Sequence, residues 1–571
     1  MTTIRIQDFR GEIPRINDRR LPPNAATIAR NCRFNSGTLE PIREGSEENV
    51  FGSAVQTIFL DSASWIGWNA DVSVARGPVA QDRLYYTGDG APKMRVSGTV
   101  YGLALDAPTV APTITNLSTP SAVAEYVVFV YTWVTDFGEE SAPSPASSSI
   151  LYSPGVTQRV SGFGTPPSGR NVTAIRIYRS QTSAAGVTDL YFASEIAVAT
   201  SSYDYDADAE PLAEAITSTD YDTPLDTLTG LISLPNGMMA AFNGRDLYFC
   251  EPFIPHAWPV KYMQTVDFPI VGLVGFGSNL AILTTGTPYV AQGLHPDSIA
   301  LEKLESGLPC VSRKGIVDLG YAAIYPSPEG LILISGQQTE NITKSIYSRE
   351  QWQLLSPETI TAARYERKYI FTRNEVAFDL LDGGDHAGWL PADETTYDGG
   401  GTSADPTAFI YDFGTPFSSF GEQRLSIIDL EADIPSVVDT DYPAPAGMYF
   451  DETTTDLYLL DDDNVTVSKF NAAESLPMTS FWRSKPFTAS VSAFYGALFV
   501  RTDRAITVDD VFKVRVYGDG TNLREITASN RCERLPSGKL CNQWEIEIES
   551  TVEVVSVTMG ATPQDVMEGP V

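Results

Sequence analysis

Histidines, cysteines and long apolar runs are scarce in this 571-residue sequence, and each scarcity argues against a class of protein. The three histidines, His256, His295 and His386, are too few and too scattered for a metal-binding array. No run of about 18 apolar residues occurs, so we expect no membrane-spanning helix and no stable membrane insertion. The segment Met1–Gly11 has no apolar core, which predicts synthesis in a cytoplasm without a secretory signal.

The five cysteines do not form the pattern of a disulfide framework, because their number is odd and most are far apart. Only Cys532 and Cys541 are close, at the two ends of CERLPSGKLC. We interpret them as thiols that flank a hairpin. A zinc site here would need further ligands.

Basic residues are also in deficit. The chain has 39 lysines and arginines against 72 acidic residues, for a formal net charge of −33. Such a surface repels nucleic acid and anionic membranes, which argues against a nucleic-acid reader of the ordinary basic kind. It remains compatible with a conduit through which DNA slides without sticking.

Amphipathic helical patterns are rare, and the best is the short stretch Leu21–Asn31. Elsewhere, short β-branched and aromatic runs alternate with turn residues, and 44 glycines and 38 prolines supply many turns. The sequence therefore predicts an all-β protein. Its length predicts two to four domains.

Similar strands recur in the second half, about 42 residues apart on average, close to the roughly 40–50 residues of a four-stranded propeller blade. This spacing predicts an irregular β-propeller, with an irregular set of β-sandwiches as the alternative. Thr57–Arg95 holds four further strand-like runs and is interpreted as another blade. The recurring strands begin near Leu247, Leu280, Leu331, Tyr369, Phe409 and Leu457.

Two segments break this spacing. The Pro-rich linker Ala107–Pro112 precedes densely spaced strands, which predict an inserted sandwich similar to fibronectin type III. From about Thr479 the strands become longer, and we expect a separate β-rich sheet beside the propeller. In it, Trp544, Ile546 and Ile548 alternate with glutamates. The predicted segments are an N-terminal platform (1–50), a first blade region (51–106), the inserted sandwich (107–229), the remaining blades (230–478) and a C-terminal β-rich interface domain (479–571).

Several phrases, in order along the chain, resemble the nozzle, or tail tubular B, proteins of short-tailed bacteriophages. The opening Phe9–Pro41 contains GEIPRINDRRLPPNAATIARNC, and the longest later phrase is LPNGMMAAFNGRDLYFC at Leu234–Cys250, followed by EPFIPHAWP at Glu251–Pro259. The other matching phrases are YYTGDGAPKM (Tyr85–Met94), YTWVTDFGEESAPSP (Tyr131–Pro145), WRSKP (Trp482–Pro486) and RLPSGKLCNQWEIEI (Arg534–Ile548).

The resemblance implies a structural virion protein of the tail, centred on a β-propeller and assembled as a homohexameric ring that conducts DNA during ejection. It implies contacts with the head–tail adaptor and with tail fibres or spikes, and no catalysis, cofactor or metal. The alternative is a peripheral receptor- or carbohydrate-binding tail protein. A nozzle lies on the particle axis, whereas a receptor binder lies at its periphery.

Each residue pattern that could form a site also has a purely structural interpretation. Gly88–Gly90 predicts a tight turn, because the lysine and hydroxyl residue of a phosphate loop do not follow. Trp258 and His256 are expected in the core, with a ligand role for them as the alternative. We therefore predict no catalytic, cofactor-binding or metal site. The acidic clusters Asp204, Asp206 and Asp208, and Asp461, Asp462 and Asp463, are interpreted as solvated turns, with calcium as the alternative.

The acidic excess suggests a mechanism for a conduit. A carboxylate-rich wall would repel the DNA backbone and keep the duplex centred, within the Debye length of about 8 Å at physiological salt. We therefore expect a net negative lumen, with basic residues such as Arg15, Arg19 and Arg20 at subunit contacts. The alternative is that the acidic composition serves solubility and is spread over the outside.

Overall fold

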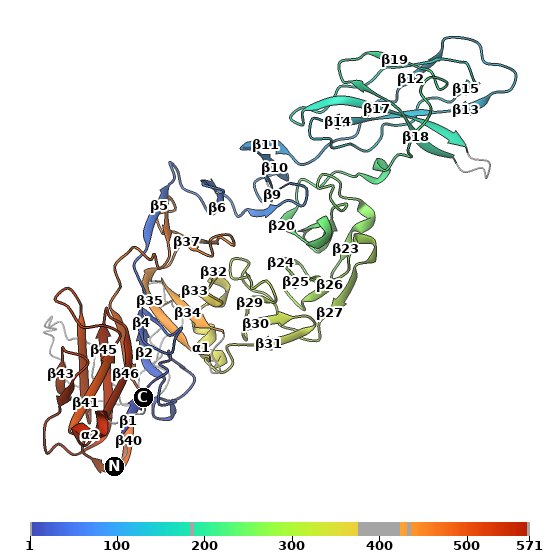
Figure 1. Ribbon diagram of the computed structural model, residues 1–571. Helices are drawn as coiled ribbons and strands as arrows, with labels where there is room; N and C mark the ends of the chain where they lie inside the picture. The colour runs from blue at the N-terminus through green and yellow to red at the C-terminus, as the bar shows by residue number, and fades with distance from the viewer. Residues whose placement is uncertain (1–2, 81, 183–187, 375–422, 431–434, 568–571) are drawn as a thin grey trace, which may run out of the picture. The chain divides into compact units, whose positions relative to one another are not determined.

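The computed structural model describes the chain except residues 1–2, 81, 183–187, 375–422, 431–434 and 568–571 (Figure 1). The described residues form 46 β-strands and two short α-helices, α1 (Arg349–Leu354) and α2 (Pro563–Met567). The prediction of an all-β protein is therefore confirmed. Within the described residues, no helix has both the length and the apolar composition needed to cross a bilayer.

The chain divides into two compact units. The first contains residues 1–52, 326–332 and 341–571, and the second contains residues 53–325 and 333–340. The first unit joins the two ends of the sequence, whereas the second is nearly continuous along the chain. The five segments expected from composition remain a prediction.

Four-stranded sheets recur along the chain, and in four of them the order of strands across the sheet is the order along the sequence. This order is expected where short turns join neighbouring strands. The sheets are β8–β11 (Ser73–Arg76, Arg83–Thr87, Lys93–Val96, Thr99–Gly102), β20–β23 (Thr229–Ser233, Met239–Asn243, Asp246–Phe249, Gln264–Thr265), β24–β27 (Ile270–Phe276, Asn279–Thr284, Tyr289–Gln292, Ala300–Lys303) and β28–β31 (Val317–Asp318, Ala323–Ser327, Gly330–Ser335, Gln338–Asn341).

Most of the recurring positions fall in strands. Leu247, Leu280 and Leu331 lie in β22, β25 and β30, and Tyr369 and Leu457 lie in β33 (Lys368–Asn374) and β37 (Leu457–Leu460). Phe409 lies outside the described residues.

The interpretation of Thr57–Arg95 as one blade is wrong. Strands β6 (Thr57–Asp61) and β7 (Ser64–Trp68) form a two-stranded sheet of their own, whereas β8 and β9 belong to the next sheet. The expected strands exist, but their local pattern did not reveal which strands pair.

The expected helix at Leu21–Asn31 is also wrong, because Ala26–Arg30 forms strand β2. This strand pairs antiparallel with β39 (Ser480–Ser484), and Ala29 lies opposite Trp482. A partner strand more than 400 residues away thus overrides a weak local helical preference.

An N-terminal strand completes a C-terminal sheet in the first unit. Strands β36 (Gly447–Phe450), β37 and β38 (Thr466–Lys469) follow one another, and the fourth strand is β5 (Ser46–Val50). Strand pairing in this sheet thus joins segments that lie about 420 residues apart in the sequence.

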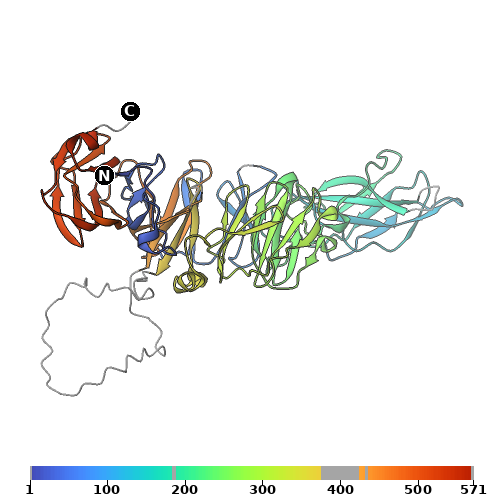
Figure 2. The ribbon, with the colours of Figure 1, turned by 90° about the horizontal axis from the view of Figure 1, so that it is seen from below.

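The longest sheet of the first unit contains ten strands. One part is β32 (Ala362–Tyr365), β33, β34 (Gln423–Asp429) and β35 (Val437–Pro443), and β2 joins this part to β39. Figure 2 shows the blue N-terminal segment beside these orange and red strands. The sheet continues through β45 (Cys541–Ser550), β42 (Phe512–Gly518) and β43 (Thr521–Ile526), and β40 (Phe487–Ala493) pairs with β45.

The long strand β45 carries the predicted alternation. Trp544, Ile546 and Ile548 are fully buried in the core of this part of the unit. Glu545 and Glu547 are also buried, at 8% and 6% exposure, because Arg483 and Arg515 pair with them. The acidic face is therefore covered by arginines. A further sheet contains β1 (Ile4–Ile6), β46 (Val554–Gly560), β41 (Ala497–Thr502) and β44 (Cys532–Arg534).

Residues 113–205 of the second unit form three small sheets around one core. The strands are β12 (Thr113–Asn116), β16 (Gln158–Ser161) and β19 (Ser202–Tyr205); β13 (Glu125–Val127) and β15 (Ile150–Tyr152); and β14 (Phe129–Thr135), β17 (Val172–Thr182) and β18 (Thr188–Ala197). Their shared core includes Phe129, Tyr131, Trp133, Ile175 and Tyr205.

Candidate functional site

The loop that follows β14 is held in place by hydroxyl groups. Thr135 begins a tight turn, and its Oγ1 accepts hydrogen bonds from the amides of Phe137 and Glu139. Gly138 has a φ of 76°, a conformation that glycine adopts without strain. The side chains of Ser141, Ser144 and Ser147 then accept the amide N–H groups of Trp133, Tyr131 and Phe129. The proline-containing segment is thereby tied along β14.

Glu139, at the tip of this loop, enters a buried ion-pair network. Its Oε2 lies 2.5 Å from a guanidinium nitrogen of Arg170, which is 2% exposed, and its Oε1 lies 3.4 Å from Arg83. Arg170 also donates to the carbonyl of Gly102 at 2.8 Å. We call Arg83, Glu139 and Arg170 the buried triad. It attaches the loop to the sheet β8–β11, because Arg83 begins β9 and Gly102 ends β11.

The neighbouring Glu140 gathers polar groups from several segments. Its Oε1 accepts from Thr132 and Tyr178, both at 2.7 Å, and its Oε2 pairs with Arg176. Burial, and then the hydrogen bond to Glu140, raise the pKa of Tyr178. The carbonyl oxygen of Glu140 lies 2.8 Å from Nε2 of His256. Both glutamate side chains are therefore fully engaged by donors, and the arrangement is suited to holding the loop in place.

His256 and Trp258 lie in the core, as predicted. They are 4% and 2% exposed, and the indole N–H of Trp258 donates to the carbonyl of Pro255. Burial lowers the pKa of His256, so its neutral form is favoured in the folded protein. Trp258 packs with Tyr85 and Met94 of the sheet β8–β11, and Phe137 adjoins the same cluster. Segments more than 100 residues apart thus form one junction.

The sequence did not point to the buried triad. Glu139 and Glu140 lie in a loop rich in serine and proline, a composition typical of an exposed turn, and Arg170 follows a similar loop. Two adjacent glutamates beside a strand made wholly of apolar, aromatic and threonine residues were the one available signal. A local pattern cannot show which distant arginine will pair with them.

Asp206 and Asp208 lie in or beside the turn after β19, and Asp461, Asp462 and Asp463 lie in the turn between β37 and β38. The interpretation of Asp204 as a turn residue is wrong, because Asp204 lies in strand β19, opposite Arg159 of β16. Asp204 forms an exposed ion pair with Arg159, and Asp206 accepts a hydrogen bond from the amide of Asp208. In the hairpin between β37 and β38, Asp463 accepts the amides of Val465 and Thr466. Within the described part of the chain, no group of three or more histidine, cysteine, aspartate or glutamate residues is arranged to hold a metal ion.

The tight turn predicted at Gly88–Gly90 is found. Gly88 and Gly90 have φ values of 107° and 76° in the turn between β9 and β10, and Asp89 pairs there with Lys93. An added Cβ at Gly88 would lie 2.2 Å from the carbonyl oxygen of Asp71, so this position requires glycine. All five cysteines are free thiols, and Cys532 and Cys541 are not joined. The expected hairpin between them is wrong, because β44 and β45 belong to different sheets.

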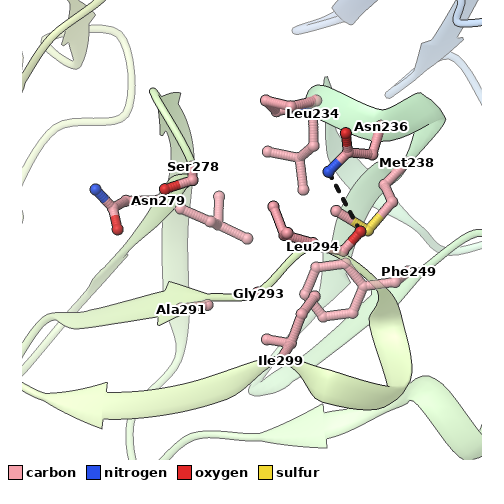
Figure 3. A pocket seen from close by; sticks show the side chains of 12 residues that line it. Leu234, Asn236, Met238, Phe249, Ser278, Asn279, Ala291, Gly293, Leu294 and Ile299 are labelled. Carbon is pink, nitrogen blue, oxygen red and sulfur yellow. Dashed lines mark hydrogen bonds between the residues drawn. The ribbon is translucent and has the colours of Figure 1, made fainter.

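An apolar hollow lies between the sheets β20–β23 and β24–β27 (Figure 3). Asn236, with a φ of 62°, donates its amide to the carbonyl of Leu294 at 3.3 Å across one side. Leu294 is 68% exposed at the rim. The hollow is lined by Leu234, Pro235, Asn236, Met238, Phe249, Ser278, Asn279, Leu280, Ala291, Gly293, Leu294 and Ile299. It has few polar groups with which to orient a ligand.

Comparisons with known proteins assign no family. No family model matches the chain, and no curated protein matches it. Among solved structures, PorZ, a surface component of the type-IX secretion system of Porphyromonas gingivalis, aligns over 72% of this chain at 11% identity and a TM-score of 0.23. The extracellular domain of a putative hybrid two-component system from B. thetaiotaomicron aligns over 73% at 8% identity and a TM-score of 0.22. The chain spans 42% of PorZ and 51% of the second protein, and likenesses this weak carry no argument about function.

Proposed function

We propose that this protein is a structural subunit of the tail of a short-tailed bacteriophage, a nozzle-type component that forms a ring around the path of the DNA. It would bind the head–tail adaptor and tail fibres or spikes, let genomic DNA pass without holding it, and carry out no catalysis. Its place would be the virion tail.

The observation that carries this proposal is that the phrases resembling nozzle proteins meet in space. Three of them, Tyr85–Met94, Tyr131–Pro145 and Glu251–Pro259, supply Met94, Glu140 and His256 to the junction around the buried triad. Two others, Phe9–Pro41 and Trp482–Pro486, pair as β2 and β39, and the indole of Trp482 donates to the carbonyl of Arg10. Separate segments that resemble nozzle proteins thus contribute to shared cores. This supports the proposal that the chain has the architecture of a nozzle protein.

We propose further that the successive four-stranded sheets are blades of an irregular propeller and that residues 107–229 are an inserted lateral sandwich. The sheet order along the chain supports the first point. So does the pairing of β5 with β38, because joining N- and C-terminal strands in one sheet is a way to close a circular array of blades.

Electron microscopy of virions tests the function. We expect density for this chain as a closed ring on the tail axis, with a six-fold stoichiometry by mass measurement of assembled tails. A single copy per tail, or density at the tail periphery, would contradict the proposal and favour the receptor-binding alternative. The isolated chain alone does not decide, because the adaptor can be required for assembly.

A further inference from the structure

A short loop of the first unit exposes cations that have no acidic partner. Arg15, Arg19 and Arg20 are exposed, and none of them makes an ion pair with another described residue. The exposed Lys344 lies beside them, because its carbonyl accepts a hydrogen bond from the Arg15 guanidinium. We call Pro14–Arg20 with Lys344 the basic loop. Its one carboxylate is Asp18, so four cations face one acid in a chain with 33 excess acidic residues.

The basic loop is fixed in place from behind. Ile13, Leu21 and Ala25 form a small buried core beneath it. The amide of Arg15 donates to the carbonyl of Ile346 at 2.8 Å, and Gln351 donates to the carbonyl of Pro14 at 2.9 Å. A surface that is already ordered loses little conformational entropy when it binds a partner.

The same unit carries an exposed surface of opposite charge. Strand β5 is the outermost strand of its sheet among the described residues. Glu47 on this strand, Glu44 just before it and Asp462 in the adjacent hairpin are exposed. We call these residues, with Asp461, the acidic edge. Burial, and then the nearby Asp463, Asp462 and Glu47, raise the pKa of Asp461, so these carboxylates repel one another.

We propose that the basic loop docks on the acidic edge of a second copy of this chain. The two surfaces are carried by separate elements of one unit, and among the described residues no ion pair joins them within a copy. A contact between two different surfaces of identical chains is heterologous and generates a ring or a filament. The inference deepens the proposed ring, and therefore rests on the proposed function. Charge complementarity of this kind would also fix the register of neighbours and speed their encounter.

Charge reversal in the full-length chain tests the contact. The variant Arg15→Glu/Arg19→Glu/Arg20→Glu is expected to raise the dissociation constant of self-association by about tenfold or more, measured by sedimentation at low salt. The variant Glu44→Lys/Glu47→Lys/Asp462→Lys should do the same. A chain that carries all six reversals should regain most of the association, because both surfaces then change sign together.

The matched control is Arg501→Glu/Arg534→Glu/Lys539→Glu. These three exposed cations belong to the same unit, and their reversal changes the net charge by the same amount. The control should associate like the wild type, and circular dichroism should show that all variants are folded. Association of the wild type should weaken steadily as salt rises.

Three results would overturn the inference. One is a wild type without salt-dependent self-association at the highest attainable concentration, both alone and with the head–tail adaptor added. A second is a variant with all six charge reversals that associates no more strongly than either triple reversal. A third is loss of binding to a short DNA duplex, with self-association intact, in the loop variant, which would identify phosphate as the partner. A ring seen in virions together with any of these results would leave the proposed function standing and reject only this contact.

Discussion

Replacement of Arg170 by methionine should destabilise the junction between the loop after β14 and the sheet β8–β11. Methionine keeps an unbranched side chain of similar reach but removes the charge and the donors. It leaves Glu139, 8% exposed, with Arg83 at 3.4 Å as its remaining cation, and it leaves the carbonyl of Gly102 without its donor. Breaking a buried ion pair from one side costs about 3–5 kcal/mol, because an uncompensated charge stays buried.

Amide hydrogen exchange measures this loss locally, which suits a chain of several cooperative units. A loss of about 3 kcal/mol corresponds to exchange roughly 100-fold faster in β14 and β17. The matched control is Arg159→Met. Its ion pair with Asp204 is 46% and 42% exposed, and removing it should change exchange far less, because solvent screens an exposed pair.

A double variant separates the charge effect from the packing effect. Arg170→Met combined with Glu139→Gln removes the buried carboxylate as well, so it should recover part of the lost protection. Equal effects of Arg170→Met and Arg159→Met would refute the reasoning, because the buried pair would then be worth no more than an exposed one. A double variant at least as unstable as the sum of its two single variants would refute the role of the buried charge.

Three further predictions follow from the described side chains. Burial lowers the pKa of His256 in the folded protein, so the stability gained from its neutral form is complete above the usual pKa of 6.5 and is lost as the pH falls below it. Thermal melts between about pH 7.5 and 5.5 should therefore show a weaker pH dependence for His256→Gln than for the wild type, and an equal pH dependence would contradict the assignment. Burial, and then the nearby Asp439, raise the pKa of Glu12 to about 8, so its contribution to stability is lost as the pH rises from 4.5 to 8. Glu12→Gln should flatten this loss in denaturant titrations, and an unchanged slope would contradict the assignment. Of the five cysteines, only Cys532 is partly exposed, and the buried ones are Cys32, Cys250, Cys310 and Cys541. A thiol reagent should therefore label Cys532 first in the native protein and all five cysteines after unfolding. Rapid labelling of several cysteines in the native protein would mean that the cores open readily.

Local chemistry was enough to predict the all-β class and many turns. The glycines of the YTGDGAP turn, the β-branched and aromatic runs, and the alternation of Trp544, Ile546 and Ile548 are signals carried by neighbouring residues. These strands could be recognised from their own patterns, and glycine adopts a positive φ without strain. The buried Trp258 follows the same logic, since its residue type carried the expectation. The hairpin expected at CERLPSGKLC did not form, because its two strands pair with other segments.

Pairing between distant segments was decided only by the tertiary structure. Ala26–Arg30 forms a strand because it pairs with β39, and β5 pairs with β38, about 420 residues further along the chain. Glu139 and Glu140 looked like turn residues, yet the fold surrounds them with Arg83, Arg170, Arg176 and His256. The free energy of a hydrogen bond or ion pair depends on which group the fold brings opposite it and on how much water it excludes. The local sequence shows which chemical groups a segment carries, and the packing of the whole chain determines which groups they contact.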